Sequence, residues 1–191
     1  STNLSATNVT YSTPSGIKKE VAVLDGTAYT DNWEFSELYK SNDYSIACVF
    51  KVDDTTLTQM ILAHTNDSND RLAILLRDTQ TLCCGHYLGS WDGWKAKSTA
   101  TGAFTDEDTH HVVIMSFDAS AKVVTMYLDG VEQTGTTNAL TNTTTGFNFG
   151  AFTSLSNKMQ WSWGRLRIFN KILDADERAK VLEDAQYWTD T

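Results

Sequence analysis

Short apolar stretches, many of them alternating with polar residues, recur along the chain between polar turns. The longest run to five residues, as at 46–50 and 72–76. Runs of this length that are rich in β-branched and aromatic residues favour strands over helices. The predicted strands are 20–24, 44–52, 60–64, 71–77, 82–88, 110–118, 123–128, 131–134, 147–150 and 161–169.

Two local signals mark a hairpin and a helix. Asp129-Gly130 separates two predicted strands and suits a type I′ turn, because both residues tolerate positive φ. Near the C-terminus, Asp174 with Glu177 three positions later forms a capping-box pattern that predicts a helix of roughly twelve residues.

Many short strands followed by one late helix predict an all-β fold of two packed sheets. The 191 residues suffice for one domain with a full-sized core. Residues 1–16 are polar and aperiodic, so we expect an extended N-terminal arm there and one domain over 17–191.

Several motifs occur in an order that resembles a known family. They are His110-His111-Val112 in a strand, Tyr127-Leu128-Asp129-Gly130 in a hairpin, and Arg167-Ile168-Phe169-Asn170 before Leu173-Asp174 and Glu177. This order resembles the laminin-G-like branch of the concanavalin A-like jelly-roll lectins. The resemblance implies a two-sheet antiparallel jelly-roll β-sandwich with one short C-terminal helix. It implies little about function, because this fold carries lectins, glycanases and structural modules alike.

The charge balance limits the partners of the protein. With 24 acidic and 15 basic residues the net charge is −9, and such a field repels nucleic acid. No apolar run approaches the about 20 residues of a membrane-spanning helix. Asp and Glu are the oxygen ligands that calcium prefers, so a structural calcium remains an open expectation, although no 12-residue calcium-loop pattern occurs and no cofactor is required.

The three cysteines, Cys48, Cys83 and Cys84, cannot all pair within the chain. Neighbours in a strand point to opposite faces, so at most one of Cys83 and Cys84 could reach Cys48. We expect three reduced, mostly buried thiols, which suggests folding in a reducing compartment.

No catalytic or metal-binding pattern is evident. Glycanases of this fold use a Glu-x-Asp-x-Glu triplet on one strand, because hydrolysis needs two carboxylates about 5 Å apart. That triplet is missing here, and Asp106-Glu107-Asp108 has the wrong spacing. His110 and His111 are strand neighbours that point oppositely, so they do not chelate one ion. We therefore predict no enzymatic activity and no catalytic metal.

Aromatic residues are the better lead to a binding site. Trp91-Asp92-Gly93-Trp94 places two indoles in a predicted loop over 89–94, and indole rings suit the flat C–H faces of sugars. The alternative is that these rings pack within the loop, since exposing two of them forgoes roughly 3–6 kcal/mol of burial. The predicted glycan site comprises Trp91, Asp92, Trp94, Tyr87 and Trp33.

A second candidate surface follows from alternation along the predicted strand 161–169. Leu166 and Ile168 share the face expected to line the core. Its opposite face, predicted to bind a glycan, a partner subunit or the C-terminal helix, carries Trp161, Trp163, Arg165 and Arg167.

The sequence favours a non-catalytic surface-recognition domain that binds glycan or a host receptor, on a phage virion or as part of a cell-surface adhesin. The abundance of threonine, 27 of 191 residues, fits an extracellular or virion-surface β protein. The alternative is a structural virion decoration or assembly protein that binds other subunits and no sugar. A glycoside hydrolase is a distant third.

Overall fold

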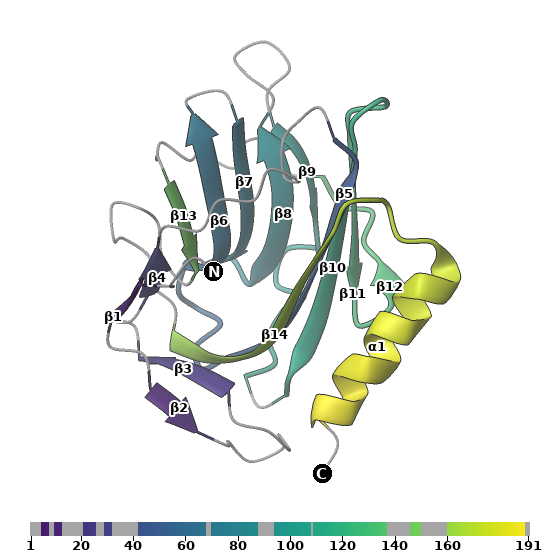
Figure 1. Cartoon of the computed structure of the whole chain (residues 1–191). Coiled ribbons are helices and arrows are strands. Elements are labelled where there is room, and N and C mark those ends of the chain that lie inside the picture. Colours follow the sequence, from purple (N-terminus) through teal and green to yellow (C-terminus); the bar gives the residue numbers. More distant parts are fainter. Residues whose placement is uncertain are drawn as a thin grey trace.

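The computed structural model shows two antiparallel sheets packed face to face, with one helix against the outside of the second sheet (Figure 1). This confirms the predicted jelly-roll β-sandwich with a short C-terminal helix. Side chains are described for residues 42–62, 72–86, 96–107, 109–136 and 166–185. The structure describes residues 5–7, 10–12, 21–25, 29–31, 42–67, 70–87, 94–107, 109–136, 146–149 and 160–189.

Each sheet has seven strands within the described residues. Sheet A has the order β1 (Ser5–Thr7), β4 (Tyr29–Asp31), β13 (Gly146–Phe149), β6 (Gln59–Asp67), β7 (Asp70–Arg77), β8 (Thr81–Tyr87) and β9 (Trp94–Ser98). Sheet B has the order β12 (Val131–Glu132), β11 (Val123–Leu128), β10 (His111–Asp118), β5 (Tyr44–Val52), β14 (Gln160–Phe169), β3 (Val21–Asp25) and β2 (Thr10–Ser12).

The core lies between the sheets and follows the alternation of the strands. Every second residue of β5 faces sheet A, from Tyr44 to Val52, and meets Ile74 and Cys84 of sheet A in one buried cluster. A polar pair crosses this core: Tyr44 Oη lies 2.6 Å from His86 Nδ1, and both residues are buried. Because a buried polar group without a partner is costly, this hydrogen bond lets His86 occupy the core as a structural residue.

Chain segments close both open sides of the sandwich. Within the predicted N-terminal arm, β1 pairs with β4 of sheet A and β2 pairs with β3 of sheet B. On the opposite side, the chain after β12 reaches sheet A, where Ser98 N donates to Gly135 O at 3.0 Å. A Cβ atom at Gly135 would lie 2.7 Å from Ser98 O, so only glycine fits this contact.

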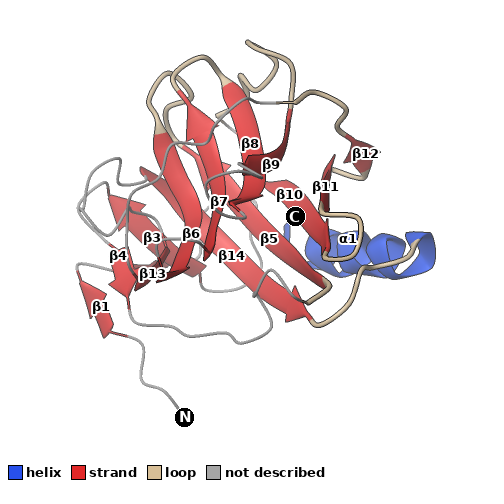
Figure 2. Ribbon diagram, turned by 90° about the horizontal axis from the view of Figure 1, so that it is seen from above, coloured by secondary structure: helices blue, strands red, loops and turns tan. Residues whose placement is uncertain are grey.

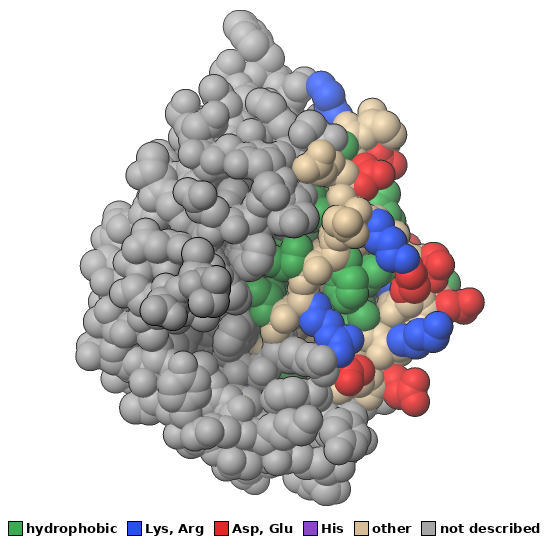
Figure 3. Space-filling view, in the orientation of Figure 1, with side chains coloured by type: hydrophobic (Ala, Val, Ile, Leu, Met, Phe, Trp, Pro, Cys, Tyr) green, Lys and Arg blue, Asp and Glu red, His purple; other side chains and the backbone are tan. Residues whose placement is uncertain are grey.

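Helix α1 (Ala175–Thr189) lies on the outer face of sheet B in both views (Figures 1 and 2). The predicted capping box is confirmed, since Glu177 N donates to Asp174 Oδ1 at 2.9 Å and Asp174 N to Glu177 Oε2 at 3.2 Å. The helix is three residues longer than the twelve expected. Val181 and Ala185 pack on Val49 of β5 within a second buried cluster. Charged side chains of both signs cover the exposed side of the helix (Figure 3).

The Ser45 hydroxyl fixes the entry to this helix. Buried on the outer face of sheet B, it donates to Lys171 O at 2.8 Å and accepts from Leu173 N at 3.1 Å. Ser116 Oγ on the neighbouring strand lies 2.7 Å away and donates the third hydrogen bond, because the proton of Ser45 is engaged by Lys171. One side chain thus ties β5, β10 and the start of α1 together.

The His-His-Val and Asp-Gly motifs meet in one interaction. Asp129 and Gly130 have φ of +50° and +83°, which confirms the type I′ geometry. The Asp129 carboxylate accepts from Val112 N at 2.8 Å and lies 2.7 Å from His111 Nδ1. The motif pair therefore fastens the β11–β12 turn to the start of β10, which gives His111 a structural role.

The cysteines follow the predicted alternation. Cys84 belongs to the core between the sheets, together with Cys48, whereas Cys83 belongs to a small buried cluster on the outer face of sheet A. All three are free and buried, as predicted. Within the described residues, no helix is long and apolar enough to span a bilayer.

Candidate ligand-binding face

One row of residues crosses the end of sheet A near two of its turns. The register pairs Thr65 of β6 with Arg71 of β7, Arg71 with Tyr87 of β8, and Tyr87 with Trp94 of β9. Directly paired residues of antiparallel strands share a face of the sheet. The register therefore puts Thr65, Arg71, Tyr87 and Trp94 on the same face of four consecutive strands. We call these residues the rim row.

Alternation assigns the rim row to the outer face of sheet A. Residues an even number of positions apart on a strand share a face. Arg71 therefore shares a face with Leu75 on β7, and Tyr87 shares a face with Cys83 on β8. Leu75 and Cys83 belong to the buried cluster on the outer face of sheet A. The row next to it consists of Ala63, Ala73, Gly85 and Ala96. β6 and β8 end at the top of the sheet in Figure 1, so the rim row lies at that end.

The structure brings together two of the five residues predicted for the glycan site. Tyr87 and Trp94 form a cross-strand pair that bounds the connection 88–93. Trp94 begins β9, so its prediction as a loop residue is wrong. The reason is that the hairpin register extends pairing to Trp94 although the preceding residues carry turn signals. Trp33, Trp91 and Asp92 lie outside the described residues.

Sequence motifs indicated neither Thr65 nor Arg71 of the rim row, and of these two Arg71 is the charged residue. Its position follows from hairpin register: once the turn 78–80 pairs Arg77 with Thr81, every further pair on β7 and β8 is fixed. Six positions further along each strand, Arg71 pairs with Tyr87. A signal was therefore present in the sequence, but it required the length of the turn to be known.

The second predicted surface is divided by a register shift. On β14, Trp161 and Trp163 pair with Val52 and Phe50, whereas Arg165 pairs with Val49. Phe50 and Val52 belong to the core between the sheets, and Val49 belongs to the cluster beneath α1. The prediction of one shared face is therefore wrong, because an extra residue at Gly164 reverses the alternation. The side chains of Trp161, Trp163 and Arg165 lie outside the described ones.

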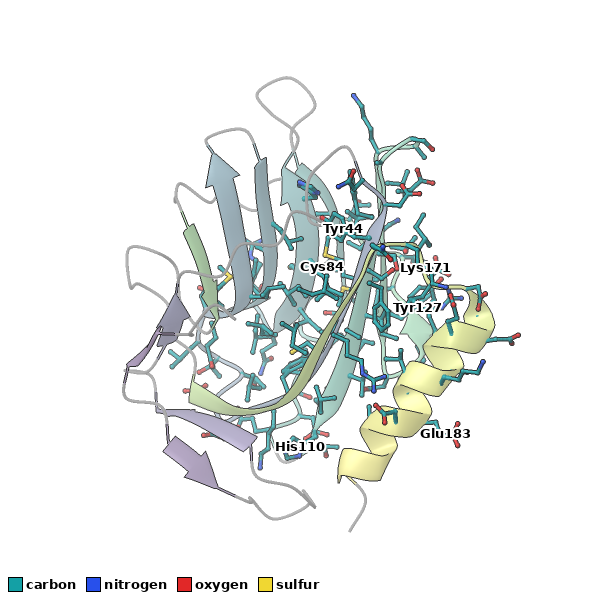
Figure 4. All side chains as sticks on the ribbon, viewed as in Figure 1. Tyr44, Cys84, His110, Tyr127, Lys171 and Glu183 are labelled. Carbon is teal, nitrogen blue, oxygen red and sulfur yellow. The ribbon has the colours of Figure 1, made fainter. Side chains whose placement is uncertain are left out.

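Arg167 faces the C-terminal helix. Its guanidinium forms an ion pair with Asp184 of α1, and both residues are half-buried beside Val181 and Ala185. This surface was predicted to bind a glycan, a partner subunit or the C-terminal helix. Arg167 contacts the C-terminal helix. Tyr127 has a similar role on β11, where Arg178 of α1 lies 4.2 Å above its ring, at the helix in Figure 4.

Acidic side chains in two loops, the β5–β6 connection and the segment before β10, stabilise the loop backbone. Glu107 Oε1 accepts from Thr55 N at 2.7 Å and from Thr55 Oγ1 at 3.0 Å, and Asp54 Oδ1 accepts from Thr56 N at 2.8 Å. Among the residues whose placement is described, no group of three or more His, Cys, Asp or Glu side chains could hold a metal ion. The structural calcium stays a prediction.

Solved structures of several other proteins have a similar fold. Domain 4 of AbnA, an extracellular arabinanase of Geobacillus stearothermophilus, solved with arabinotriose, aligns with a TM-score of 0.68 at 17% identity, over 94% of this chain and 87% of that one. The CBM40 of the Ruminococcus gnavus IT-sialidase, bound to α2,3-sialyllactose, gives a TM-score of 0.55 at 12% identity over 76% and 84%.

A toxin domain has the same fold. The binding domain of botulinum neurotoxin serotype D aligns with a TM-score of 0.63 at 14% identity over 95% of this chain, which spans 46% of that structure. At these identities the likeness shows the fold alone. No curated protein sequence matches significantly.

A family model described as the concanavalin A-like lectin/glucanases superfamily matches residues 25–177. This match covers the predicted family motifs, from His110 to the helix cap at Glu177. The chain belongs to the concanavalin A-like lectin/glucanase superfamily.

Proposed function

We propose that this domain is a carbohydrate-binding module whose site lies on the outer face of sheet A, where β8 meets β9. The observation that carries the proposal is the cross-strand pairing of Tyr87 with Trp94 within the rim row. Two adjacent aromatic residues offer apolar planes for the C–H faces of a sugar, and each also has a polar group for a hydroxyl.

The chain connectivity adds two predicted site residues to this pair. The connection 88–93 has six residues and includes Trp91 and Asp92. Because it starts beside Tyr87 and ends beside Trp94, both residues are within a few residues of the rim row. An acidic side chain next to aromatic rings supplies acceptors for sugar hydroxyls.

The proposed role is recognition without hydrolysis. The chain has no Glu-x-Asp-x-Glu triplet, and the described Glu107 and Asp54 are engaged by loop backbone. The similar structures solved with sugar ligands, an arabinanase domain and a sialidase CBM40, show that this fold can present a glycan site. We further propose that the domain acts outside the cell, on a virion or a cell surface.

A glycan array followed by calorimetry on the hits tests this function. The expected result is saturable binding to at least one glycan, with no new reducing ends after prolonged incubation. Binding that is lost in Trp94→Ala but kept in Leu57→Ala, an exposed residue of the β5–β6 connection, would locate the site. Absence of binding to every glycan, together with association with other surface or virion subunits, would favour the structural decoration protein instead.

A further inference from the structure

We infer that the glycan bound at the rim row carries a carboxylate, and that Arg71 recognises it. The inference rests on the proposed function and adds the chemical class of the ligand. Its basis is the juxtaposition of Thr65, Arg71, Tyr87 and Trp94 as paired positions on four consecutive strands.

The chemistry of arginine makes this position informative. A guanidinium is charged at every physiological pH and presents a planar fork of donors that matches a carboxylate in two parallel hydrogen bonds. Neighbouring strands are about 4.8 Å apart. Arg71 is thus one strand from Tyr87 and two from Trp94, so one acidic sugar could stack on an aromatic residue while its acid group meets Arg71.

The net charge of the protein would not by itself produce a preference for acidic glycans. With a net charge of −9, the molecule as a whole repels an anionic ligand. At physiological ionic strength this repulsion is screened beyond about 8 Å, whereas a direct ion pair is not. A preference for acidic glycans would therefore have to arise locally, at a basic residue within the site.

The same strand supplies a matched control. Arg77 lies six residues from Arg71 on the same face of β7, so the two are about 20 Å apart. Arg77 is exposed and pairs with Thr81 at the opposite end of the sheet. Replacing it changes the net charge of the protein by the same amount without altering the rim row.

The test compares acidic glycans with their neutral counterparts by calorimetry at physiological salt. The probes are sialyllactose with lactose, and trigalacturonic acid with its methyl ester. We expect the acidic member of one pair to bind at least tenfold more tightly. Arg71→Gln should remove that difference, Arg71→Lys should restore part of it, and Arg77→Gln should leave it unchanged.

The outcomes separate the two proposals. Equal affinity for acidic and neutral members, or an acid preference that survives Arg71→Gln, overturns the inference and leaves carbohydrate binding intact. Failure to bind any glycan on the array overturns the proposed function and this inference together. The comparison of acid with methyl ester uses the unmodified protein, so it decides whether the ligand is acidic even if Arg71→Gln does not fold. In that case Arg71→Lys, with an acid preference weaker than that of the wild type, tests the role of Arg71, and an unchanged preference overturns it.

Discussion

At the scale of single residues, His110 links the stability of the domain to pH. It directly precedes β10 and lies toward the lower end of the sandwich in Figure 4. Partial burial, helped by the charges of Lys51 and His111, lowers the pKa of His110 to about 4, from the ordinary value of 6.5. Folding thus favours the neutral imidazole.

The sign of the effect follows from proton linkage. Between pH 6.5 and about 4, the unfolded state binds the His110 proton more than the folded state does, so acidification favours unfolding. Chemical denaturation of the wild type and His110→Asn at pH 7 and pH 4.5 should show a greater loss of stability in the wild type. Equal losses in the two proteins would contradict this environment for His110.

At the scale of secondary-structure elements, the β11–β12 hairpin gives the sharpest prediction. Gly130 has φ of +83°, and a Cβ atom there would lie 3.0 Å from Leu182 Cδ1 of α1. We expect Gly130→Val to reduce the unfolding free energy by about 1–3 kcal/mol, because a β-branched residue resists positive φ.

The adjacent substitution Val131→Thr is the control, since Val131 is 64% exposed and needs no special backbone conformation. Its effect should stay within about 0.5 kcal/mol. Thermal melts of both variants measure the difference. A Gly130→Val protein as stable as the wild type would mean that the turn relaxes without cost.

The elements show what the sequence could and could not predict. Segments rich in β-branched and aromatic residues, such as β5 and β11, were predicted with their observed bounds. Three-residue strands such as β1 and β4 were missed, because three residues carry no measurable alternation and such strands form through pairing with distant segments. The shift at Gly164 was missed for a related reason: a bulge is visible only against the partner strand.

At the scale of the whole molecule, the cysteines test the packing of both sheets. Burial raises the pKa of Cys83 to about 11 and also raises that of Cys84, so neither is a reactive thiolate near neutral pH. We expect slow modification of the native protein by a thiol reagent and three reactive thiols per chain after denaturation without reductant. A single thiol would reveal a disulfide and contradict the free state of the cysteines.

The candidate site combines residues of several strands of sheet A, so the sequence alone could define only part of it. The aromatic content of 87–94 was visible as a motif, but the rim row joins Arg71 to Trp94 through two successive hairpins. Each hairpin fixes a register that depends on its turn length. Residues from separate strands become neighbours only when both registers are known, so Arg71 could not be selected beforehand.

The most direct test measures affinity and thermal stability on the same two variants, Trp91→Ala and Trp94→Ala. If the β8–β9 end of sheet A binds glycan, each change should weaken binding to the cognate sugar at least tenfold, about 1.4 kcal/mol, with little change in melting temperature. If these rings instead pack within the protein, each change should cost roughly 3–5 kcal/mol of stability and cause no specific binding defect. That second result would contradict a carbohydrate site at this end of the sheet.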